Sequence, residues 1–417
     1  MRHLGGTNLL GFALLNPCLM HLSSRSLLAR TCLVLAASFA FGLSASAQRA
    51  LPDGVVAHRD MPYVENGHER QVLDLYLPEK SEGPLPLVIW IHGGAWAAGN
   101  KDGCPPLGAG YVQRGYAVAS INYRLSQHAI FPAQIEDCKA AIRWLRAHAT
   151  DYGIDPDHFG VAGSSAGGHL VALVGTSGDV TAFDLGANLD VSSRVQAVAD
   201  YYGPTDFVQM DANAVKGARL VHDDPKSPES RLIGGPIQEP ANYEKVQAAN
   251  PITYVTSDDP PFVIIHGDVD PMVPHHQSEL LHASLTQNGT PTHFITVLGG
   301  GHGQGFPGKE LEPLVMAFFD QYLRGQPDTL HWAKSSTSEV TAIEEQPRER
   351  PAANANRSGP PPWPVLLQRS DRNKDGKIAR DEFQGPPALF SRLDANGDGF
   401  LTEAEHNAVV QRGQGRN

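Results

Sequence analysis

The sequence has few cysteines, no long apolar stretch inside the chain and no excess of positive charge. Its 417 residues include only four cysteines, and 33 lysines and arginines stand against 45 acidic residues, so the formal net charge is −12. A nucleic-acid partner requires a basic face, and this charge argues against one. Because no internal apolar run reaches the roughly 18 residues that cross a bilayer, we expect no membrane span in the mature chain.

The first 47 residues have the pattern of an export signal. Arg25 and Arg30 precede the apolar run TCLVLAASFAFGL, and Ala45 and Ala47 are the small residues of a cleavage site. The region before the run is longer than a signal normally carries, so we expect translation to begin at Met20. The mature protein is therefore expected to be exported, either to the periplasm or out of the cell.

Removal of this signal leaves two cysteines, Cys104 and Cys138. Two remaining cysteines in an exported protein tend to pair, so we favour a disulfide between them. The alternative is two buried thiols, since the sequence does not give the separation that a bridge requires.

Buried strands alternate with helices along most of the chain. Continuous apolar runs such as LVIWI are bounded by proline and glycine, which is typical of strands buried on both faces. Strands are expected near 70–79, 87–91, 116–124, 158–163, 195–203, 260–268 and 292–301. Helices are expected after the serine-containing turn at 163–167 and near 132–149, 275–289 and 310–325. The alternation predicts an α/β fold with a doubly wound, mostly parallel sheet covered on both faces.

The composition divides the mature chain into three parts. Residues 48–333 are expected to form the α/β domain, with an insertion over the sheet at 205–250, where the alternation fails and Pro, Gly and Asn are frequent. Residues 334–364 contain almost nothing to bury and are expected to be a linker. Residues 365–417 are expected to be a small separate module.

The stretch GVAGSSAGGHL places Ser165 in a G-x-S-x-G pattern between a predicted strand and a predicted helix. A tight strand-to-helix turn leaves no room for side chains beside the central residue, and Gly163 and Gly167 provide that room. The turn exposes Ser165 above the edge of the sheet, while the neighbouring Ser164 is expected to point elsewhere. Ser165 is therefore the candidate nucleophile.

A serine nucleophile needs a base, an acid that orients the base, and donors for the oxyanion. The loop DVDPMVP offers two carboxylates after one strand, and His302 in GGGHGQGF follows the next. Such loops lie where an open α/β sheet builds its sites. Backbone amides for the oxyanion are expected from Gly94, Ala95 and Ala166.

The motifs HGGAW, GSSAGG, GDVDPMVP and GGGHG, in this order, resemble the α/β-hydrolase superfamily. They are similar to its esterase branch, near the bacterial feruloyl and acetyl-xylan esterase-like and hormone-sensitive-lipase-like families, over about residues 51–325. The resemblance implies Ser165 as nucleophile, Asp270 as acid and His302 as base, with the amides of Gly94, Ala95 and Ala166 as oxyanion donors. Many relatives have a third glycine where Ala95 stands, and alanine keeps the amide.

Other polar residues near these motifs have competing interpretations. Asp268 is a second candidate acid, but the family pattern favours the second aspartate of GDxDP. His92 is expected to hold the oxyanion loop by hydrogen bonding, and Trp96 is expected either to line the pocket or to lie in the core. Four further histidines are expected to be surface or packing residues: His169, His275, His276 and His293.

Two acidic loops near the C-terminus resemble paired EF-hands. DRNKDGKIARDE and DANGDGFLTEAE each carry oxygen ligands at alternating positions, a glycine at position six and a glutamate at position twelve. The expected Ca2+ ligands, including two backbone carbonyls, are Asp371, Asn373, Asp375, Lys377 and Glu382 in the first loop and Asp394, Asn396, Asp398, Phe400 and Glu405 in the second. Water is expected to replace a ligand at Ala379, and Thr402 stands at position nine of the second loop.

The two loops start only 23 residues apart (394 − 371), which is too close for two full helices between them. We therefore expect a compact helical module with a small core of Phe383, Leu389, Phe390 and Leu393. Such a module needs metal to fold, and its calcium is expected to be structural rather than a signal.

The resemblance implies an exported serine esterase that hydrolyses carboxylic esters through an acyl-enzyme. It suggests acetyl or feruloyl esters of plant polysaccharide, or a small-molecule ester, as the substrate, with no cofactor in catalysis. Two alternatives are a serine peptidase of the same fold and a non-catalytic hydrolase-fold binding protein. The complete set of nucleophile, acid and base argues against the second alternative. The calcium module is expected to face a cell-surface or matrix partner.

Overall fold

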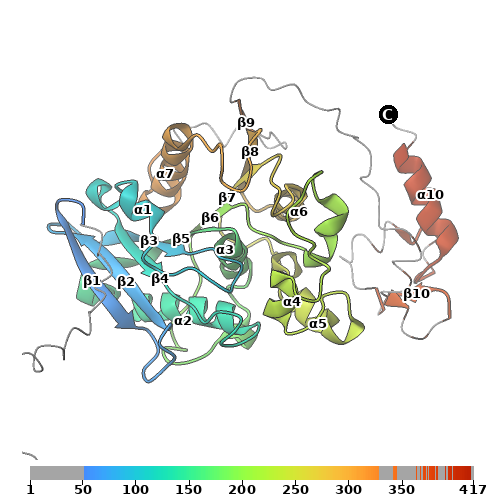
Figure 1. The fold of residues 1–417 in the computed structure, drawn as a ribbon, viewed down its shortest axis with the longest axis horizontal. Helices are drawn as coiled ribbons and strands as arrows, with labels where there is room; N and C mark the ends of the chain where they lie inside the picture. The colour runs from blue at the N-terminus through green and yellow to red at the C-terminus, as the bar shows by residue number, and fades with distance from the viewer. Residues whose placement is uncertain are drawn as a thin grey trace, which may run out of the picture.

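The structure is a computed structural model, and it contains one large α/β domain (Figure 1). The proposed signal and part of the C-terminal region lie outside the residues that it describes. Described are residues 51–327, the strand at 341–344, and within the C-terminal region residues 363, 367, 370–371, 373, 375–380, 382–383, 390, 393–396 and 398–414.

The α/β domain is built on one sheet with the order β1-β2-β4-β3-β5-β6-β7-β8-β9. From β4 to β9 neighbouring strands are parallel, whereas β2 is antiparallel to both β1 and β4. This arrangement confirms the predicted α/β class with a mostly parallel sheet. The strands are β1 (Val55–Pro62), β2 (Val72–Pro78), β3 (Leu85–Ile91), β4 (Ala117–Ile121), β5 (Ile154–Ser164), β6 (Ala197–Tyr201), β7 (Phe262–Gly267), β8 (Thr292–Leu298) and β9 (Thr341–Glu344).

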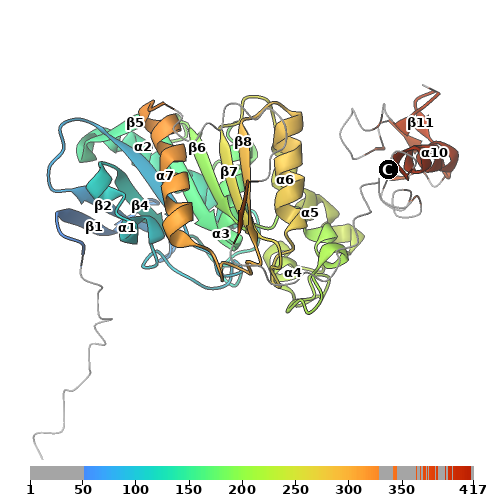
Figure 2. The same cartoon turned by 90° about the horizontal axis from the view of Figure 1, so that it is seen from above.

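Helices cover both faces of this sheet and bury two separate apolar clusters. The helices are α1 (Pro105–Gly108), α2 (Ala133–Ala147), α3 (Ala166–Thr176), α4 (Pro228–Ile233), α5 (Tyr243–Ala248), α6 (His276–Gln287), α7 (Gly308–Arg324) and, near the C-terminus, α10 (Glu403–Gln414). One cluster joins α2, α3 and α6 to one face of the strands, and the other joins α7 to the opposite face. In Figure 2 α7 lies over the strands on the viewer's side.

Strand β3 shows why the central strands read as continuous apolar runs. Leu87, Ile89 and Ile91 enter the first cluster, while Val88 and Trp90 enter the second, because successive side chains of a strand point to opposite faces. A parallel strand with helices on both sides is therefore apolar throughout. No helix in the described part of the chain combines the length and the apolar character needed to cross a bilayer.

The segment between β6 and β7 contains the predicted insertion. Short helices replace the regular alternation there, namely α4, α5 and several single 3-10 turns between Phe207 and Tyr254. The segment contacts the body of the domain, because Phe207, Leu232 and Val246 all belong to the apolar cluster on the α2 and α3 side.

The expected disulfide between Cys104 and Cys138 is wrong. Both cysteines are free thiols in the structure. Cys138 lies in α2 within the first apolar cluster, whereas Cys104 packs against the second cluster on the other face of the sheet. The sheet separates the two side chains, and burial raises the pKa of the Cys104 thiol to about 12.

Two edge strands were not expected from the sequence. β1 pairs antiparallel with β2 and has an irregular register between His58 and Met61. β9 lies inside the predicted linker and pairs in parallel with β8, with Thr341 opposite Ile295. A strand at a sheet edge can be held by backbone pairing alone, so it needs no apolar pattern.

Candidate active site

Ser165 lies in the sharp turn between β5 and α3. Its backbone has φ +57° and ψ −122°, a conformation that residues with a side chain rarely adopt. The Ser165 amide donates a hydrogen bond to the carbonyl oxygen of Tyr201 at 2.9 Å, which fixes the turn to the end of β6. The structure thus holds the Ser165 side chain at the carboxyl end of the sheet.

The glycines beside Ser165 are required by close backbone contacts. A Cβ atom at Gly167 would lie 2.1 Å from the carbonyl oxygen of Ile91, and one at Gly163 would lie 2.4 Å from the carbonyl oxygen of Gly167. Both distances are far shorter than a van der Waals contact. The steric reason for the G-x-S-x-G pattern given by the sequence therefore holds in the folded chain.

The structure brings Ser165, His302 and Asp270 into one hydrogen-bonded line. Nε2 of His302 lies 2.9 Å from Oγ of Ser165, and Nδ1 of His302 lies 2.7 Å from Oδ2 of Asp270. A carboxylate only accepts hydrogen bonds, so Nδ1 carries the proton and the lone pair of Nε2 faces the serine hydroxyl. This geometry allows His302 to take the proton of Ser165.

Asp270 is held in its ionised form by its surroundings. Its Oδ1 accepts the amides of Met272 at 2.7 Å and Val273 at 3.0 Å, and its Oδ2 also lies 3.3 Å from Nε2 of His266. Burial alone would raise the pKa of Asp270, but hydrogen bonds from His266 and His302 hold it well below its usual range. The rival Asp268 instead accepts the Gly299 amide, at 2.6 Å.

His266 supports the acid and was missed by the sequence analysis. Its Nε2 lies 3.0 Å from the carbonyl oxygen of Val273, so this nitrogen is a donor that Asp270 shares. Its Nδ1 accepts the hydroxyl of Ser278 at 2.7 Å, and burial lowers the pKa of His266, so the ring is neutral. One signal was available, because His266 interrupts the otherwise apolar strand FVII.

The loop after β3 lies against the Ser165 turn. A Cβ atom at Gly93 would lie 2.5 Å from the carbonyl oxygen of Ser164 and 3.2 Å from Cβ of Ser165. Gly94 and Ala95 follow with φ of +114° and +54°. Ala166 is the first residue of α3, and amides at this end of a helix have no acceptor inside the helix. The three predicted oxyanion donors thus come from the two segments that meet at Ser165.

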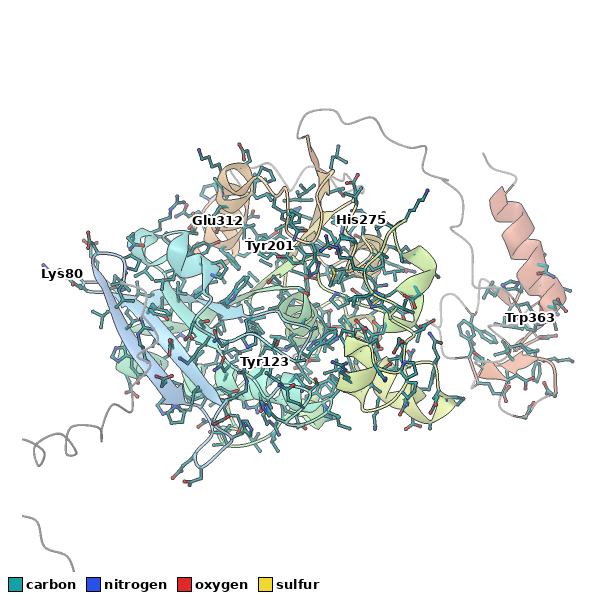
Figure 3. All side chains as sticks on the ribbon, in the orientation of Figure 1. Lys80, Tyr123, Tyr201, His275, Glu312 and Trp363 are labelled. Atoms are coloured by element: carbon teal, nitrogen blue, oxygen red, sulfur yellow. The ribbon has the colours of Figure 1, made fainter. Side chains whose placement is uncertain are left out.

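Among the other histidines near the motifs, His92, His169 and His275 have structural partners. Nδ1 of His92 lies 2.7 Å from the carbonyl oxygen of Gly93, and burial lowers the pKa of His92 to about 4. His169 is fully buried and lies between Nε1 of Trp96 and the carbonyl oxygen of Ala249. Trp96 is itself buried against His169 and is therefore a core residue. His275 (labelled in Figure 3) stacks on an aromatic ring of β8. His276 is the first residue of α6, and His293 lies in β8.

A cleft of about 1230 Å³ reaches Ser164, the residue before the candidate nucleophile. Its lining also includes Gly93, Trp90, Lys101 and Asp60. A second cavity of about 790 Å³ lies near the start of β3, at the opposite end of the strands from Ser165. Of these two cavities the first reaches a residue next to Ser165, and neither is lined by Ser165, His302 or Asp270.

The two acidic loops face each other across a short antiparallel pair of strands, β10 (Ile378–Ala379) and β11 (Phe400–Leu401). Ile378 pairs with Leu401, the eighth residues of the two loops. The small core here consists of Trp363, Ile378, Phe390, Leu393 and Leu401, with Phe383 packed beside it. Of the predicted core, Leu389 lies outside the described residues.

Carboxylates at positions one and twelve of each loop turn toward the backbone of their own loop. Asp371 accepts the Gly376 amide at 2.9 Å and Glu382 accepts the Ala379 amide at 3.0 Å. Gly376 and its counterpart Gly399 have φ of +82° and +84°, as a sharp bend at position six requires. Asp394 and Glu405 accept backbone amides of the second loop in the same way: Gly399 and Ala395.

The remaining predicted ligands lie in the same two loops. The side-chain amides of Asn373 and Asn396 donate to Asp375 and Asp398, respectively. The backbone carbonyls predicted as ligands belong to Lys377 and Phe400. The donors are all oxygens, which suits a hard cation. Among the described residues no three His, Cys, Asp or Glu side chains gather into a metal-holding group. The oxygen donors suit a hard cation such as calcium, but in the described loops the carboxylates bond to backbone amides, so calcium binding stays a prediction.

Comparisons with known proteins find similarity to proteins named as esterases. A family model described as BD-FAE matches residues 73–285. The chain is 36% identical over 246 residues to Esterase LipQ of Mycobacterium tuberculosis, which is 58% of this chain and 56% of that protein. The chain thus spans little more than half the length of this curated relative.

The chain also matches solved structures with related folds, and these matches cover most of the length of the solved chains. A structure described as a truncated form of a carbohydrate esterase from gut microbiota is 38% identical with a TM-score of 0.56, over 64% of this chain and 96% of that one. An acetyl ester-xyloside bifunctional hydrolase from Caldicellulosiruptor lactoaceticus is 25% identical with a TM-score of 0.50, over 66% of this chain and 95% of that one.

Proposed function

The chain belongs to the BD-FAE family, and on this premise we propose that it is a serine esterase that hydrolyses carboxylic esters. The observation that carries the proposal is the hydrogen-bonded line from Ser165 through His302 to Asp270, with distances of 2.9 and 2.7 Å. Similarity to Esterase LipQ and to a carbohydrate esterase supports the same reaction class.

The proposed reaction is acyl transfer through Ser165. His302 removes the hydroxyl proton as Oγ attacks the ester carbonyl, and the amides of Gly94, Ala95 and Ala166 stabilise the oxyanion. His302 then gives the proton to the leaving alcohol, and water hydrolyses the acyl-enzyme with the same base. Asp270 stays ionised throughout, which favours the protonated form of His302 in each transition state.

We propose esters of polysaccharide, acetyl or feruloyl, as the substrate class. Support comes from the neighbours described as a carbohydrate esterase and as an acetyl ester-xyloside bifunctional hydrolase. A panel of p-nitrophenyl acetate and butyrate, methyl ferulate and acetylated xylan distinguishes the acyl groups. Peptide anilides belong in the same panel, because cleavage of these alone would favour a peptidase.

Replacement of the nucleophile tests the reaction. We expect Ser165→Ala to lower kcat on p-nitrophenyl acetate by roughly 10⁴-fold or more, since no other group attacks the carbonyl. The matched control is Ser177→Ala, because Ser177 is a buried serine just after the same helix whose hydroxyl donates to the Leu173 carbonyl. The control should lose some thermal stability and keep its kcat. Equal activity in Ser165→Ala and the wild-type protein would refute the proposal.

We further propose that the protein is exported and that its C-terminal loops bind structural Ca2+. The export signal in the first 47 residues supports the first part, and cleavage is tested by N-terminal sequencing of protein recovered from the periplasm or medium. The paired loops, with an oxygen donor at every ligand position except Ala379, support the second part. A cell-surface or matrix partner for this module remains part of the same proposal.

A further inference from the structure

One side chain from outside the oxyanion loop contacts both ends of that loop. Arg70 lies in the turn before β2, far in sequence from the loop at 92–99. Its Nη2 lies 2.9 Å from the carbonyl oxygen of Gly99 and 3.1 Å from Nε2 of His92. Its Nε donates to the carbonyl oxygen of Tyr123 at 2.8 Å. A guanidinium nitrogen carries two hydrogens, so Nη2 serves both ends of the loop at once.

The contact with His92 has a defined direction. A carbonyl oxygen only accepts, so the 2.7 Å contact with Gly93 means that Nδ1 of His92 carries the proton. Nε2 is then a lone pair, and Arg70 donates to it. Burial, together with the charge of Arg70, keeps His92 neutral at ordinary pH. Arg70 therefore selects one tautomer of His92, and that tautomer holds the Gly93 carbonyl.

The loop needs such support because its backbone is strained. Gly94, Ala95 and Trp96 are three successive residues with positive φ, and two of them carry side chains. The loop also closes tightly, since a Cβ atom at Gly99 would lie 2.4 Å from the carbonyl oxygen of Gly93. A strained conformation persists only where neighbouring contacts fix it, and here those contacts converge on His92 and Gly99.

Tyr123 completes the support from the other side of His92. Its ring stacks on the imidazole with centroids 4.4 Å apart, and its hydroxyl donates to the His92 carbonyl at 2.9 Å. Tyr123 lies in the interior of the domain, near α2 (Figure 3). Because Arg70 also holds the Tyr123 carbonyl, one guanidinium ties the stacking partner and the two ends of the loop together.

We propose that Arg70 is a positioning residue that holds the amides of Gly94 and Ala95 in the geometry that binds the oxyanion. The inference rests on the proposed esterase function and adds a residue outside the four motifs. Arg70 touches no reacting atom. Its contribution is made through the loop, so its loss should weaken transition-state binding and leave substrate binding nearly unchanged.

The test measures kinetics and oxyanion affinity in Arg70→Ala and Arg70→Lys. Active sites are first counted by phosphonate titration, so that misfolded protein does not enter the rates. We expect Arg70→Ala to lower kcat and kcat/KM on p-nitrophenyl acetate by roughly 30-fold with KM changed less than threefold. The inhibition constant of a trifluoromethyl ketone, which places an oxyanion in the same site, should rise by a similar factor. The rate and the inhibition constant of Arg70→Lys should lie between those of Arg70→Ala and the wild-type protein, because an ammonium group keeps the charge but not the several N–H donors of the planar guanidinium.

Arg146→Ala is the matched control. The Arg146 guanidinium also ties three backbone carbonyls, those of Pro156, Ser192 and Arg194, but at a distance from the loop. This control should lose thermal stability with kcat and inhibitor affinity unchanged. The proposal is overturned if Arg70→Ala behaves like Arg146→Ala, with only a lower melting temperature. A wild-type protein that is inactive on every ester would instead refute the proposed function, before any variant is compared.

Discussion

Asp200 is a buried carboxyl group close to the nucleophile turn. It lies near the end of β6, where Oδ1 accepts the Gly203 amide at 2.9 Å, and within the described part of the chain its Oδ2 has no hydrogen-bond partner. Burial raises the pKa of Asp200 to about 7, only partly opposed by the Gly203 hydrogen bond. The folded protein therefore keeps Asp200 protonated at a pH where the unfolded chain ionises it.

The sign of this shift gives a prediction for stability. A carboxyl group whose folded pKa is raised contributes stability that is fully present below about pH 4 and is lost as the pH rises through about 7. Asparagine cannot titrate, so Asp200→Asn does not lose this stability. Between pH 5 and pH 8 its free energy of unfolding should therefore rise relative to that of the wild-type protein, by about 2 kcal/mol. Thermal unfolding of both proteins at the two pH values measures the gain. Exposed Asp190→Asn is the control, and a difference for Asp200→Asn that does not change with pH would contradict the prediction.

At the residue scale the sequence located the groups that carry local motifs. Ser165, Asp270 and His302 each follow a predicted strand, and strands of a parallel sheet bring such loops to one edge. Arg70 and His266 were missed, because their roles depend on packing between segments far apart in the chain. No pattern in the sequence links a single arginine before a strand, such as Arg70, to the loop that begins at His92.

The turn between β5 and α3 depends on atoms of a neighbouring element. Cβ of an alanine at position 167 would meet the carbonyl oxygens of Ile91 and His92, at 2.1 and 2.7 Å. These are backbone atoms at the end of β3, so neither can rotate away as a side chain would. Space for the serine turn is therefore set by how closely α3 approaches β3.

Gly167→Ala should therefore destabilise the domain and damage the site together. We expect a loss of about 3 kcal/mol in the free energy of unfolding, because backbone must shift to admit the methyl group. The esterase rate should fall as well, since the shift moves Ser165 against the oxyanion loop. Chemical denaturation and p-nitrophenyl acetate kinetics measure the two effects. Gly308→Ala at the start of α7 meets nothing within 4 Å and should be nearly neutral in both, so an equally mild Gly167→Ala would contradict the steric argument.

Elements with strong apolar patterns were predicted and edge elements were not. β3 and β7 are buried on both faces, and their apolar runs LVIWI and FVII stand out in the sequence. β1 carries Arg59 and Asp60 and alternates weakly, because one edge of it is unpaired in the sheet. β9 pairs with β8 from inside the predicted linker, whose composition shows no strand pattern.

On the scale of the whole chain, two parts are expected to respond differently to calcium. The α/β domain has two large apolar clusters, whereas the C-terminal module has one small cluster around Trp363 and Ile378. A core this small rarely supports a fold alone, and bound metal adds its binding energy to folding. Carboxylates that bond to loop amides here, such as Glu382 and Glu405, are the groups a cation would recruit.

Calcium removal should therefore unfold the module and leave the esterase intact. In the full chain we expect calorimetry to show a low-temperature transition that shifts upward with millimolar Ca2+ and disappears in chelator, while kcat on p-nitrophenyl acetate stays the same. The rate is unaffected because the proposed chemistry passes through Ser165 and His302, which belong to the other part. Titration calorimetry should give calcium binding that Glu382→Gln and Glu405→Gln each weaken at least tenfold, since both remove a bidentate ligand.

The neighbouring Glu403 is the control for this experiment. It is exposed in the first turn of α10 and is not among the expected ligands, so Glu403→Gln keeps the loops while changing the net charge by the same amount. If all three variants weaken binding equally, calcium is attracted by the acidity of the region and not held by the loops. Absence of binding at millimolar calcium in the wild-type chain would exclude the calcium proposal, and the Ser165 prediction would stand independently.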